Sequence, residues 1–257
     1  MKWETTYYPA LDELSLAAAR FIRNLARERI ERRGIFTLVL SGGKTPRGLY
    51  EILAGPEFQH AMPWSGIHLF WGDERCVPPD HSESNYHMAF EAMISRTEIP
   101  PRNIHRIPAE MDPPEAAARQ YARILRDFFF TAEEQGMNHA RPGTSESLPS
   151  FDLILLGMGE DGHTASLFPG AGALDEDTLW VSAVQDPVGS PPVPRITLTL
   201  PVINEAQNVL FMVAGPEKWD VLRTIVESPS KAAARYPAAR INPRGRLLLF
   251  HDCEILG

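Results

Sequence analysis

The sequence predicts an α/β fold, a doubly wound and mainly parallel sheet flanked by helices. Five short apolar runs are spaced along the chain, and amphipathic helical patterns lie between them. Strands that are covered on both faces have continuous apolar runs, whereas half-exposed strands alternate. Strands that alternate with helices along the chain are typical of a parallel sheet with crossover helices.

The five apolar runs are the predicted strands, because each is too short to be a buried helix. The predicted helices come from apolar residues spaced three and four apart, in one segment near the start of the chain and one near its middle. The strands are expected at residues 36–40, 67–71, 151–156, 209–214 and 247–250, and shorter helices at 46–54, 83–94 and 217–226. The longer helical patterns consist of Leu14, Ala18, Phe21, Ile22 and Leu25, and of Tyr121, Ile124, Leu125 and Phe128.

Two segments have the composition of loops. Residues 133–150 are polar and rich in Gly, Pro and Ser, and are long enough to link two domains. Residues 185–194 contain four prolines, which excludes a central strand. Because the strand pattern resumes unchanged after each segment, we expect residues 1–257 to form a single domain with a long surface loop, in preference to two domains.

Composition narrows the classes of function. The chain has 257 residues, of which 44% are hydrophobic, and a formal net charge of −8. This is ordinary globular composition with enough chain to bury a core. The acidic balance argues against a nucleic-acid or anionic-membrane binder, since such proteins need a broad basic surface. A site for an anionic ligand would therefore have to concentrate positive charge locally.

The sequence also predicts a cytoplasmic protein without a metal. The first residues lack the apolar core of a signal peptide, and no run approaches the length of a membrane span. Cys76 and Cys253 lie far apart and are expected to be reduced thiols. Six of the eight histidines show neither HExxH nor another tight metal-ligand spacing. They are His68, His81, His87, His105, His139 and His251.

Small and ionisable residues follow four of the predicted strands, at the edge where parallel α/β sheets bind ligands. After the first strand comes Ser41-Gly42-Gly43-Lys44-Thr45-Pro46. Glycines allow a ligand to approach the backbone, and Pro46 suits the first turn of a helix, whose free N–H groups attract phosphate. The spacing does not fit a P-loop for nucleoside triphosphates. A plain glycine turn is the alternative.

The segment after the third strand carries the candidate general base. Residues 157–162 match GxGxxG, but Glu160 and Asp161 would place two carboxylates where a dinucleotide pyrophosphate should lie. The turn is better suited to hold Asp161 and His163 as reacting or orienting groups, because His titrates near neutral pH. Asp73, after the second strand, is expected to reach the same cleft, although a solvated charge cluster is the alternative.

Taken together, these motifs resemble the 6-phosphogluconolactonase family. The match lies in residues 41–46 (SGGKTP), 71–78 (WGDERCVP), 84–86 (SNY), 157–169 (GMGEDGHTASLFP) and 195–199 (RITLT). It covers nearly the whole chain in the same order. Lys44 is a departure, since the family often has a small residue or Arg there.

The resemblance implies a Rossmann-like fold and hydrolysis of 6-phospho-D-glucono-1,5-lactone to 6-phospho-D-gluconate in the oxidative pentose phosphate pathway, without cofactor or metal. A small sugar phosphate lactone would be the partner, with no nucleic acid and no membrane. The oligomeric state stays open, and a monomer is compatible with the sequence. The nearest rival is glucosamine-6-phosphate deaminase, whose loop carries a glutamate where this chain has Phe168. A non-catalytic sugar-phosphate sensor is a further alternative.

Under this interpretation each site residue has an expected role. His163 takes a proton from the attacking water, Asp161 orients or polarises His163, and Asp73 positions the sugar hydroxyls or the water. Arg75 binds substrate or holds Asp73, and the sequence does not separate these roles. The residues expected at the substrate phosphate are Ser41, Gly42, Gly43 and Thr45 of the glycine loop and, by resemblance, Arg195 and Lys218.

Overall fold

A parallel sheet forms the centre of the computed structural model, which describes residues 3–134, 148–185, 189 and 191–253. Its seven strands run in the order β1-β10-β9-β6-β2-β3-β5, and every neighbouring pair is parallel. The strands are β1 (Glu4–Tyr7), β2 (Phe36–Leu40), β3 (Ile67–Trp71), β5 (Ile104–His105), β6 (Leu153–Leu156), β9 (Asn208–Val213) and β10 (Arg246–His251). The predicted fold class is confirmed.

The five apolar runs all form strands of this sheet, with ends that differ from the predicted ones by at most two residues. The two outer strands were not predicted from sequence. All four residues of β1 are exposed, and β5 has two half-buried residues. Neither strand is buried on both faces, so neither has the continuous apolar run that identifies the others.

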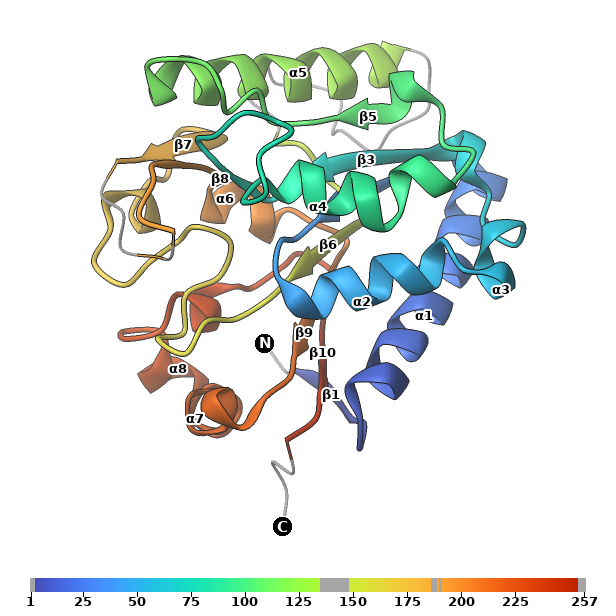
Figure 1. Ribbon diagram of the computed structural model, residues 1–257. Coiled ribbons are helices and arrows are strands. Elements are labelled where there is room, and N and C mark those ends of the chain that lie inside the picture. Colours follow the sequence, from blue (N-terminus) through green and yellow to red (C-terminus); the bar gives the residue numbers. More distant parts are fainter. Residues whose placement is uncertain (1–2, 135–147, 186–188, 190, 254–257) are drawn as a thin grey trace.

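The helices are α1 (Leu11–Arg33), α2 (Lys44–Leu53), α3 (Pro56–Gln59), α4 (Asn85–Ala92), α5 (Pro114–Glu134), α6 (Leu200–Asn204), α7 (Trp219–Glu227) and α8 (Pro229–Ala232). All five predicted helices are present. Helix α2 packs between α1 and α4 (Figure 1). The direction in which strands are added reverses after β5, because β6 lies on the other side of β2 from β3. The reversal leaves a crevice beyond the carboxyl ends of β2 and β6, where such sheets bind ligands.

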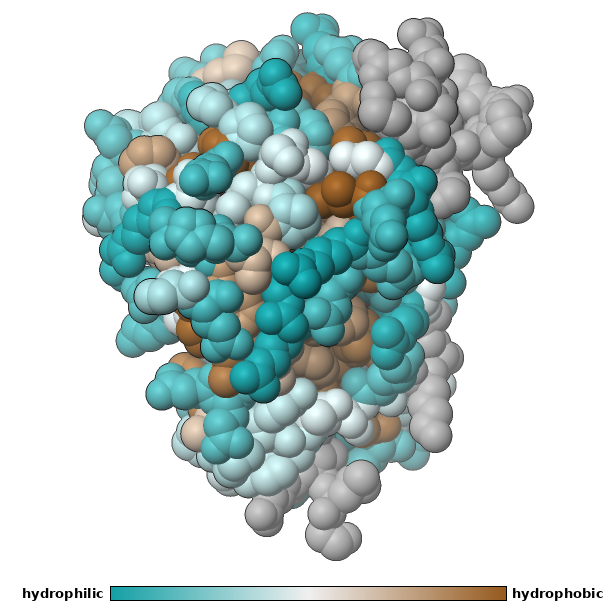
Figure 2. Space-filling view, turned by 90° about the vertical axis from the view of Figure 1, so that its right-hand side faces the viewer, coloured by the Kyte–Doolittle hydropathy of each residue, from teal (hydrophilic) through white to brown (hydrophobic). Residues whose placement is uncertain are grey.

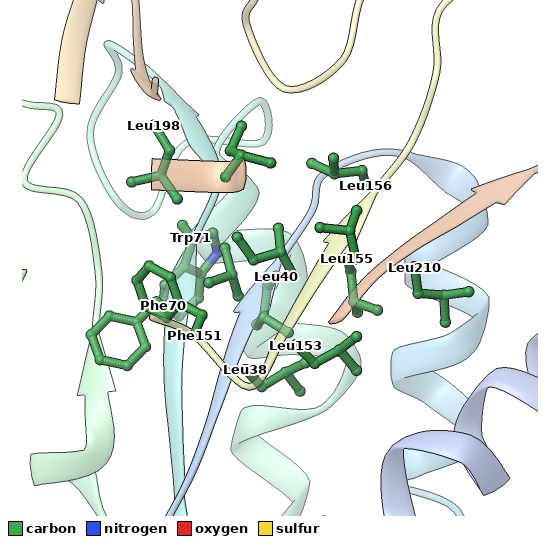
Figure 3. Close-up of a cluster of buried hydrophobic side chains, with 14 of the residues drawn as sticks. Leu38, Leu40, Phe70, Trp71, Phe151, Leu153, Leu155, Leu156, Leu198 and Leu210 are labelled. Carbon is green, nitrogen blue, oxygen red and sulfur yellow. The ribbon is translucent and has the colours of Figure 1, made fainter. Parts of the chain in front are cut away.

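A second, smaller sheet lies beside the carboxyl end of β3. It is antiparallel, has the order β4-β8-β7, and consists of β4 (Asp73–Arg75), β8 (Arg195–Leu198) and β7 (Val181–Val184). The amide of Leu198 donates to the carbonyl of Gly72 over 2.8 Å and joins this sheet to the end of β3. Figure 3 shows Leu198 in the same buried cluster as Trp71 and Leu156. The two sheets therefore share a hydrophobic core.

The segments expected to be loops lie partly outside the described residues. Helix α5 extends through the first two residues of 133–150, and residues 148–150 have no regular structure. Residues 135–147 and most of 186–190 are not described. Hydrophilic residues predominate on the face shown in Figure 2. Among the described residues, no helix is both long enough and apolar enough to cross a membrane.

Candidate active site

A cavity of about 190 Å³ opens at the carboxyl ends of β2, β3, β6 and β9. The sequence-predicted site residues line it, except Asp161, which contacts the lining residue His163. The residues on the cavity are Ser41, Gly42, Gly43, Lys44, Thr45, Pro46, Asp73, Arg75, Asn85, Gly157, Met158, Gly159, His163, Thr164, Ala165, Arg195, Met212 and Lys218. The tertiary fold thus brings together motifs that are dispersed over most of the chain.

The glycine loop lines the cavity between β2 and the first turn of α2. Gly43 is the N-cap of α2, and Lys44 and Thr45 are its first residues. The hydroxyl of the buried Tyr50 holds the loop from behind: it accepts from the Ser41 amide over 3.0 Å and donates to the Ser41 carbonyl over 2.8 Å. The positive end of the helix dipole and the free amides of its first turn therefore face the cavity, an arrangement that suits an anion.

Four cationic side chains surround the same cavity, whereas Asp73 is the one carboxylate among its described lining residues. Lys44 comes from α2, and Lys218 comes from a short 3₁₀ turn after β9. Arg75 and Arg195 are direct cross-strand partners in the antiparallel pair β4–β8. A chain with a net charge of −8 has in this way concentrated positive charge at one point. Such a local excess of cations attracts a small anion.

Arg195 is the most enclosed of these cations, with 5% of its surface exposed. Burial lowers the pKa of its guanidinium, and the nearby carboxylate of Asp73 opposes that shift. One terminal nitrogen of Arg195 donates to the carbonyl of Pro191 over 3.3 Å. A guanidinium held in this way is oriented before a ligand arrives, and its planar fork matches phosphate oxygens.

Asp73 is 6% exposed and is held by hydrogen bonds on both carboxylate oxygens. The hydroxyl of Ser166 donates to Oδ2 over 2.7 Å, and the side-chain amide of Asn85 donates to Oδ1 over 3.2 Å. Asn85 Nδ2 also lies 2.9 Å from the carbonyl of Asp73. Asp73 is thus a fixed acceptor on the wall of the cavity, not a solvated surface charge.

Glu74, the neighbour of Asp73, anchors this wall to α4. Its buried carboxylate accepts from the amides of Asn85 and Tyr86 at the start of α4, over 2.7 and 2.8 Å, and from the hydroxyl of Ser84 over 2.9 Å. Burial raises the pKa of Glu74, and these donors act in the opposite direction. The network fixes Asn85 where it can hold Asp73.

His163 and Asp161 form a hydrogen-bonded pair on the loop after β6. The imidazole Nδ1 lies 2.5 Å from Asp161 Oδ1, and the same oxygen accepts from the His163 backbone amide over 3.1 Å. The side chain of His163 is 30% exposed. With Nδ1 held by a carboxylate, Nε2 is the ring nitrogen left for proton transfer.

Gly159 is required for this pair to form. A Cβ at Gly159 would lie 2.2 Å from His163 Nδ1 and 2.8 Å from Asp161 Oδ1, so any larger residue would displace the ring. The amide of Gly159 donates to the His163 carbonyl over 2.9 Å and closes the turn. The second glycine of this GxGxxG sequence thus makes room for the His163 side chain.

Comparison with known proteins identifies the family. Residues 9–249 match the family described as Glucosamine-6-phosphate isomerases/6-phosphogluconolactonase. The chain belongs to this family. It is 43% identical over 224 residues to the 6-phosphogluconolactonase of Nostoc sp., a match that covers 87% of this chain and 84% of that protein. The 6-phosphogluconolactonase of Synechocystis sp. is likewise 43% identical, over 223 residues and the same shares of both chains.

Solved structures agree with this assignment. The crystal structure of 6-phosphogluconolactonase from Thermotoga maritima is 33% identical with a TM-score of 0.78, and the match covers 96% of this chain and 99% of that one. The 6-phosphogluconolactonase from Trypanosoma cruzi is 30% identical with a TM-score of 0.83, covering 99% and 96%. A monomeric glucosamine-6-phosphate deaminase, at 19% identity and a TM-score of 0.75 over 96% and 97% of the two chains, shares the fold.

Some residues of the candidate site were not predicted from the sequence. Lys44 was noted only as a departure from the family pattern, yet it lines the cavity. Asn85 and Ser166 lie inside the family motifs, but their hydrogen bonds to Asp73 follow from tertiary contacts 12 and 93 residues apart in the chain. Tyr50 follows the glycine loop by one to two helical turns, so its position in the sequence could have suggested a contact with the loop. The same spacing is equally typical of a core residue.

Proposed function

We propose that this chain hydrolyses 6-phospho-D-glucono-1,5-lactone to 6-phospho-D-gluconate in the oxidative pentose phosphate pathway. The observation that carries the proposal is one cavity lined both by four cationic side chains and by His163, which is paired with Asp161. The cationic side chains suit a phosphate dianion, and the His163–Asp161 pair suits activation of water. The relatives named 6-phosphogluconolactonase support the same reaction. We place the protein in the cytoplasm.

The phosphate is the proposed anchor, since it is remote from the bond that breaks. The amides of Gly42 and Gly43 and the hydroxyl of Thr45 approach it from the α2 side, with Ser41 supporting the loop. Arg195 supplies paired donors, and Lys218 supplies a point charge. Binding energy from this end orients the lactone carbonyl at the other.

His163 is the proposed general base. As a water oxygen bonds to C1 of the lactone, Nε2 accepts one proton from that water, and the carbonyl π electrons move to the carbonyl oxygen. When the tetrahedral intermediate collapses, the bond between C1 and the ring oxygen breaks, and the imidazolium returns the proton to that oxygen. The product is the open-chain acid. The carboxylate of Asp161 stabilises the imidazolium formed between the two steps.

Asp73 and Arg75 have supporting roles in this proposal. Asp73 is an acceptor fixed by Ser166 and Asn85, so it suits a sugar hydroxyl or the attacking water. Arg75 donates from one terminal nitrogen to the carbonyl of Glu83 over 2.6 Å, which directs it away from a simple ion pair with Asp73. Since it also lines the cavity beside Arg195, we assign Arg75 to substrate binding.

The deciding experiment measures acid release from 6-phosphogluconolactone and subtracts the spontaneous hydrolysis. Replacing His163 with Ala should lower kcat by about 10²–10⁴-fold, the usual contribution of a general base. The control is His60→Gln, because His60 is exposed just after the short helix α3 and does not line the cavity. A folded His163→Ala protein with wild-type turnover would refute the assignment of the base.

Two outcomes of the same assay would favour the alternatives. Release of ammonia from glucosamine 6-phosphate would indicate a deaminase. Saturable binding of 6-phosphogluconate without lactone hydrolysis would indicate a sensor.

A further inference from the structure

Phe168 contacts both the proposed general base and a proposed phosphate ligand, although it does not line the cavity itself. Its ring centre lies 4.6 Å from that of His163, with an angle of 38° between the planes. The guanidinium carbon of Arg195 lies 5.5 Å from the same ring centre. The proposed base and the proposed phosphate ligand come from different elements, and this one side chain joins them.

The ring of Phe168 has little freedom to move. The residue is 1% exposed, and its carbonyl accepts from the Ala171 amide over 3.1 Å. Gly189 lies close to both side chains: a Cβ there would lie 3.0 Å from Phe168 Cζ and 2.7 Å from Arg195 Nη2. The Arg195 guanidinium and the Phe168 ring are therefore packed together beside Gly189.

We propose that Phe168 is a positioning residue that couples occupancy of the phosphate site to the orientation of the His163 imidazole. The proposal rests on the function assigned above. A guanidinium is attracted to the face of an aromatic ring, and so is the imidazolium that forms when His163 accepts a proton. The ring fixes both groups without offering either a hydrogen-bond acceptor that would compete with substrate. Phosphate binding then holds Arg195, Phe168 and His163 in one arrangement, which aligns the base with the water.

The variant that tests the coupling is Phe168→Leu, which keeps an apolar side chain but removes the aromatic face. Its matched control is Phe58→Leu. Phe58 is also fully buried and also lies 5.5 Å from a guanidinium carbon, that of Arg23. It lies in α3, beyond the far end of α2 from the glycine loop. Both variants lose a comparable packing interaction, but only one is joined to the site.

The first readout requires no turnover. Inorganic phosphate is titrated into protein labelled with ¹⁵N-histidine, and the imidazole signals of His163 are followed by NMR. We expect phosphate to shift these signals in the wild type and in Phe58→Leu, and to shift them less than half as far in Phe168→Leu. An equal shift in Phe168→Leu, or none in the wild type, would overturn the coupling.

The second readout is kinetic and uses the phosphorylated lactone and unphosphorylated gluconolactone. Phe168→Leu should lower kcat/KM for the phosphorylated substrate by roughly tenfold to a hundredfold, through both kcat and KM, and should narrow the preference over gluconolactone. Arg195→Ala should then lower kcat/KM for the phosphorylated substrate by a smaller factor in the Phe168→Leu protein than in the wild type. The proposal would be contradicted if the loss of kcat/KM in the double variant were the product of the losses in the two single variants. It would also be contradicted if Phe168→Leu lowered kcat/KM equally for both substrates.

The two readouts separate this proposal from the proposed function. A phosphate response of His163 that depends on Phe168, in a protein without lactonase activity, would keep the coupling and refute the function. Lactonase activity in a protein whose His163 responds to phosphate equally with and without Phe168 would keep the function and refute the coupling.

Discussion

Arg195 shows how much one buried cation contributes to a site in an acidic protein. It is 5% exposed, its partner across the strand pair is Arg75, and burial lowers its pKa. Burial removes solvation from the Arg195 guanidinium, which costs free energy, and a bound phosphate dianion can offset this cost. The residue is therefore expected to act on recognition of the phosphate more than on the chemistry at C1.

Replacing Arg195 with Ala should raise KM for the phosphorylated lactone by about tenfold to a hundredfold, the range of a charged hydrogen bond. Arg195→Lys should recover part of the loss, because Lys keeps the charge without the paired donors. Steady-state kinetics on both lactones would measure this. Equal losses on phosphorylated and unphosphorylated lactone would show that Arg195 does not bind the phosphate.

At the scale of the elements, two buried tyrosines hold the ends of neighbouring strands in the same way. The Tyr50 hydroxyl bonds both the amide and the carbonyl of Ser41, just after β2. The Tyr121 hydroxyl bonds both the amide and the carbonyl of Trp71, the last residue of β3, over 3.0 Å each. Each hydroxyl therefore pairs with a backbone amide and a backbone carbonyl where the hydrogen bonds of the sheet end. Burying these two backbone groups without a partner would be costly.

These tyrosines form a matched pair for an experiment. Tyr50→Phe and Tyr121→Phe should each lower the free energy of unfolding by about 1–3 kcal/mol, because each leaves a buried amide and carbonyl without that partner. Only Tyr50→Phe should raise KM for the phosphorylated lactone, by about threefold to tenfold, since Ser41 lines the cavity and Trp71 does not. Urea unfolding and steady-state kinetics give the two quantities. A rise in KM of equal size in both variants would show that the effect is general loosening.

At the scale of the whole molecule, one cluster of buried side chains includes residues of both sheets and of the helices around them. We propose from this that the described residues form one domain. Two partly buried histidines beside this cluster serve the fold and not the site. His68 on β3 and His105 on β5 lie with Nδ1 and Nε2 3.1 Å apart, packed against Phe128 and far from the proposed base in the sequence.

This histidine pair makes stability depend on pH. Burial lowers the pKa of both His68 and His105 to about 4, whereas histidine in an unfolded chain titrates near 6.5. Between about pH 6.5 and 4 the unfolded state therefore binds more protons, so the free energy of unfolding falls as the pH falls through this window. Protonating both rings would also place two donors against each other.

Urea unfolding at pH 7.5, 6 and 5 would test the pair. His68→Phe should give a shallower fall in stability than the wild type, and His60→Gln, which changes an exposed histidine, should leave the slope unchanged. A slope in His68→Phe as steep as in the wild type would show that other groups cause the acid sensitivity.

The sequence by itself determined five of the seven strands of the central sheet and most of the residues around the cavity. A parallel strand buried on both faces needs an unbroken apolar run, so β2, β3, β6, β9 and β10 were visible without coordinates. Ligands of such sheets bind beyond the carboxyl ends of the strands, so the segments after those runs contained Ser41, Asp73, His163 and Lys218.

Only the tertiary structure decided how these residues are held. Strand β4 consists of Asp73, Glu74 and Arg75, a polar segment with no strand pattern, and it is a strand because β8 supplies its hydrogen-bonding partner from 120 residues away. That pairing places Arg75 opposite Arg195, and the contact of Phe168 with both His163 and Arg195 depends on the same arrangement. Residue type and spacing predict the secondary structure and the local chemistry of a segment. Contacts between distant segments depend on how the whole core packs, and no local pattern encodes them.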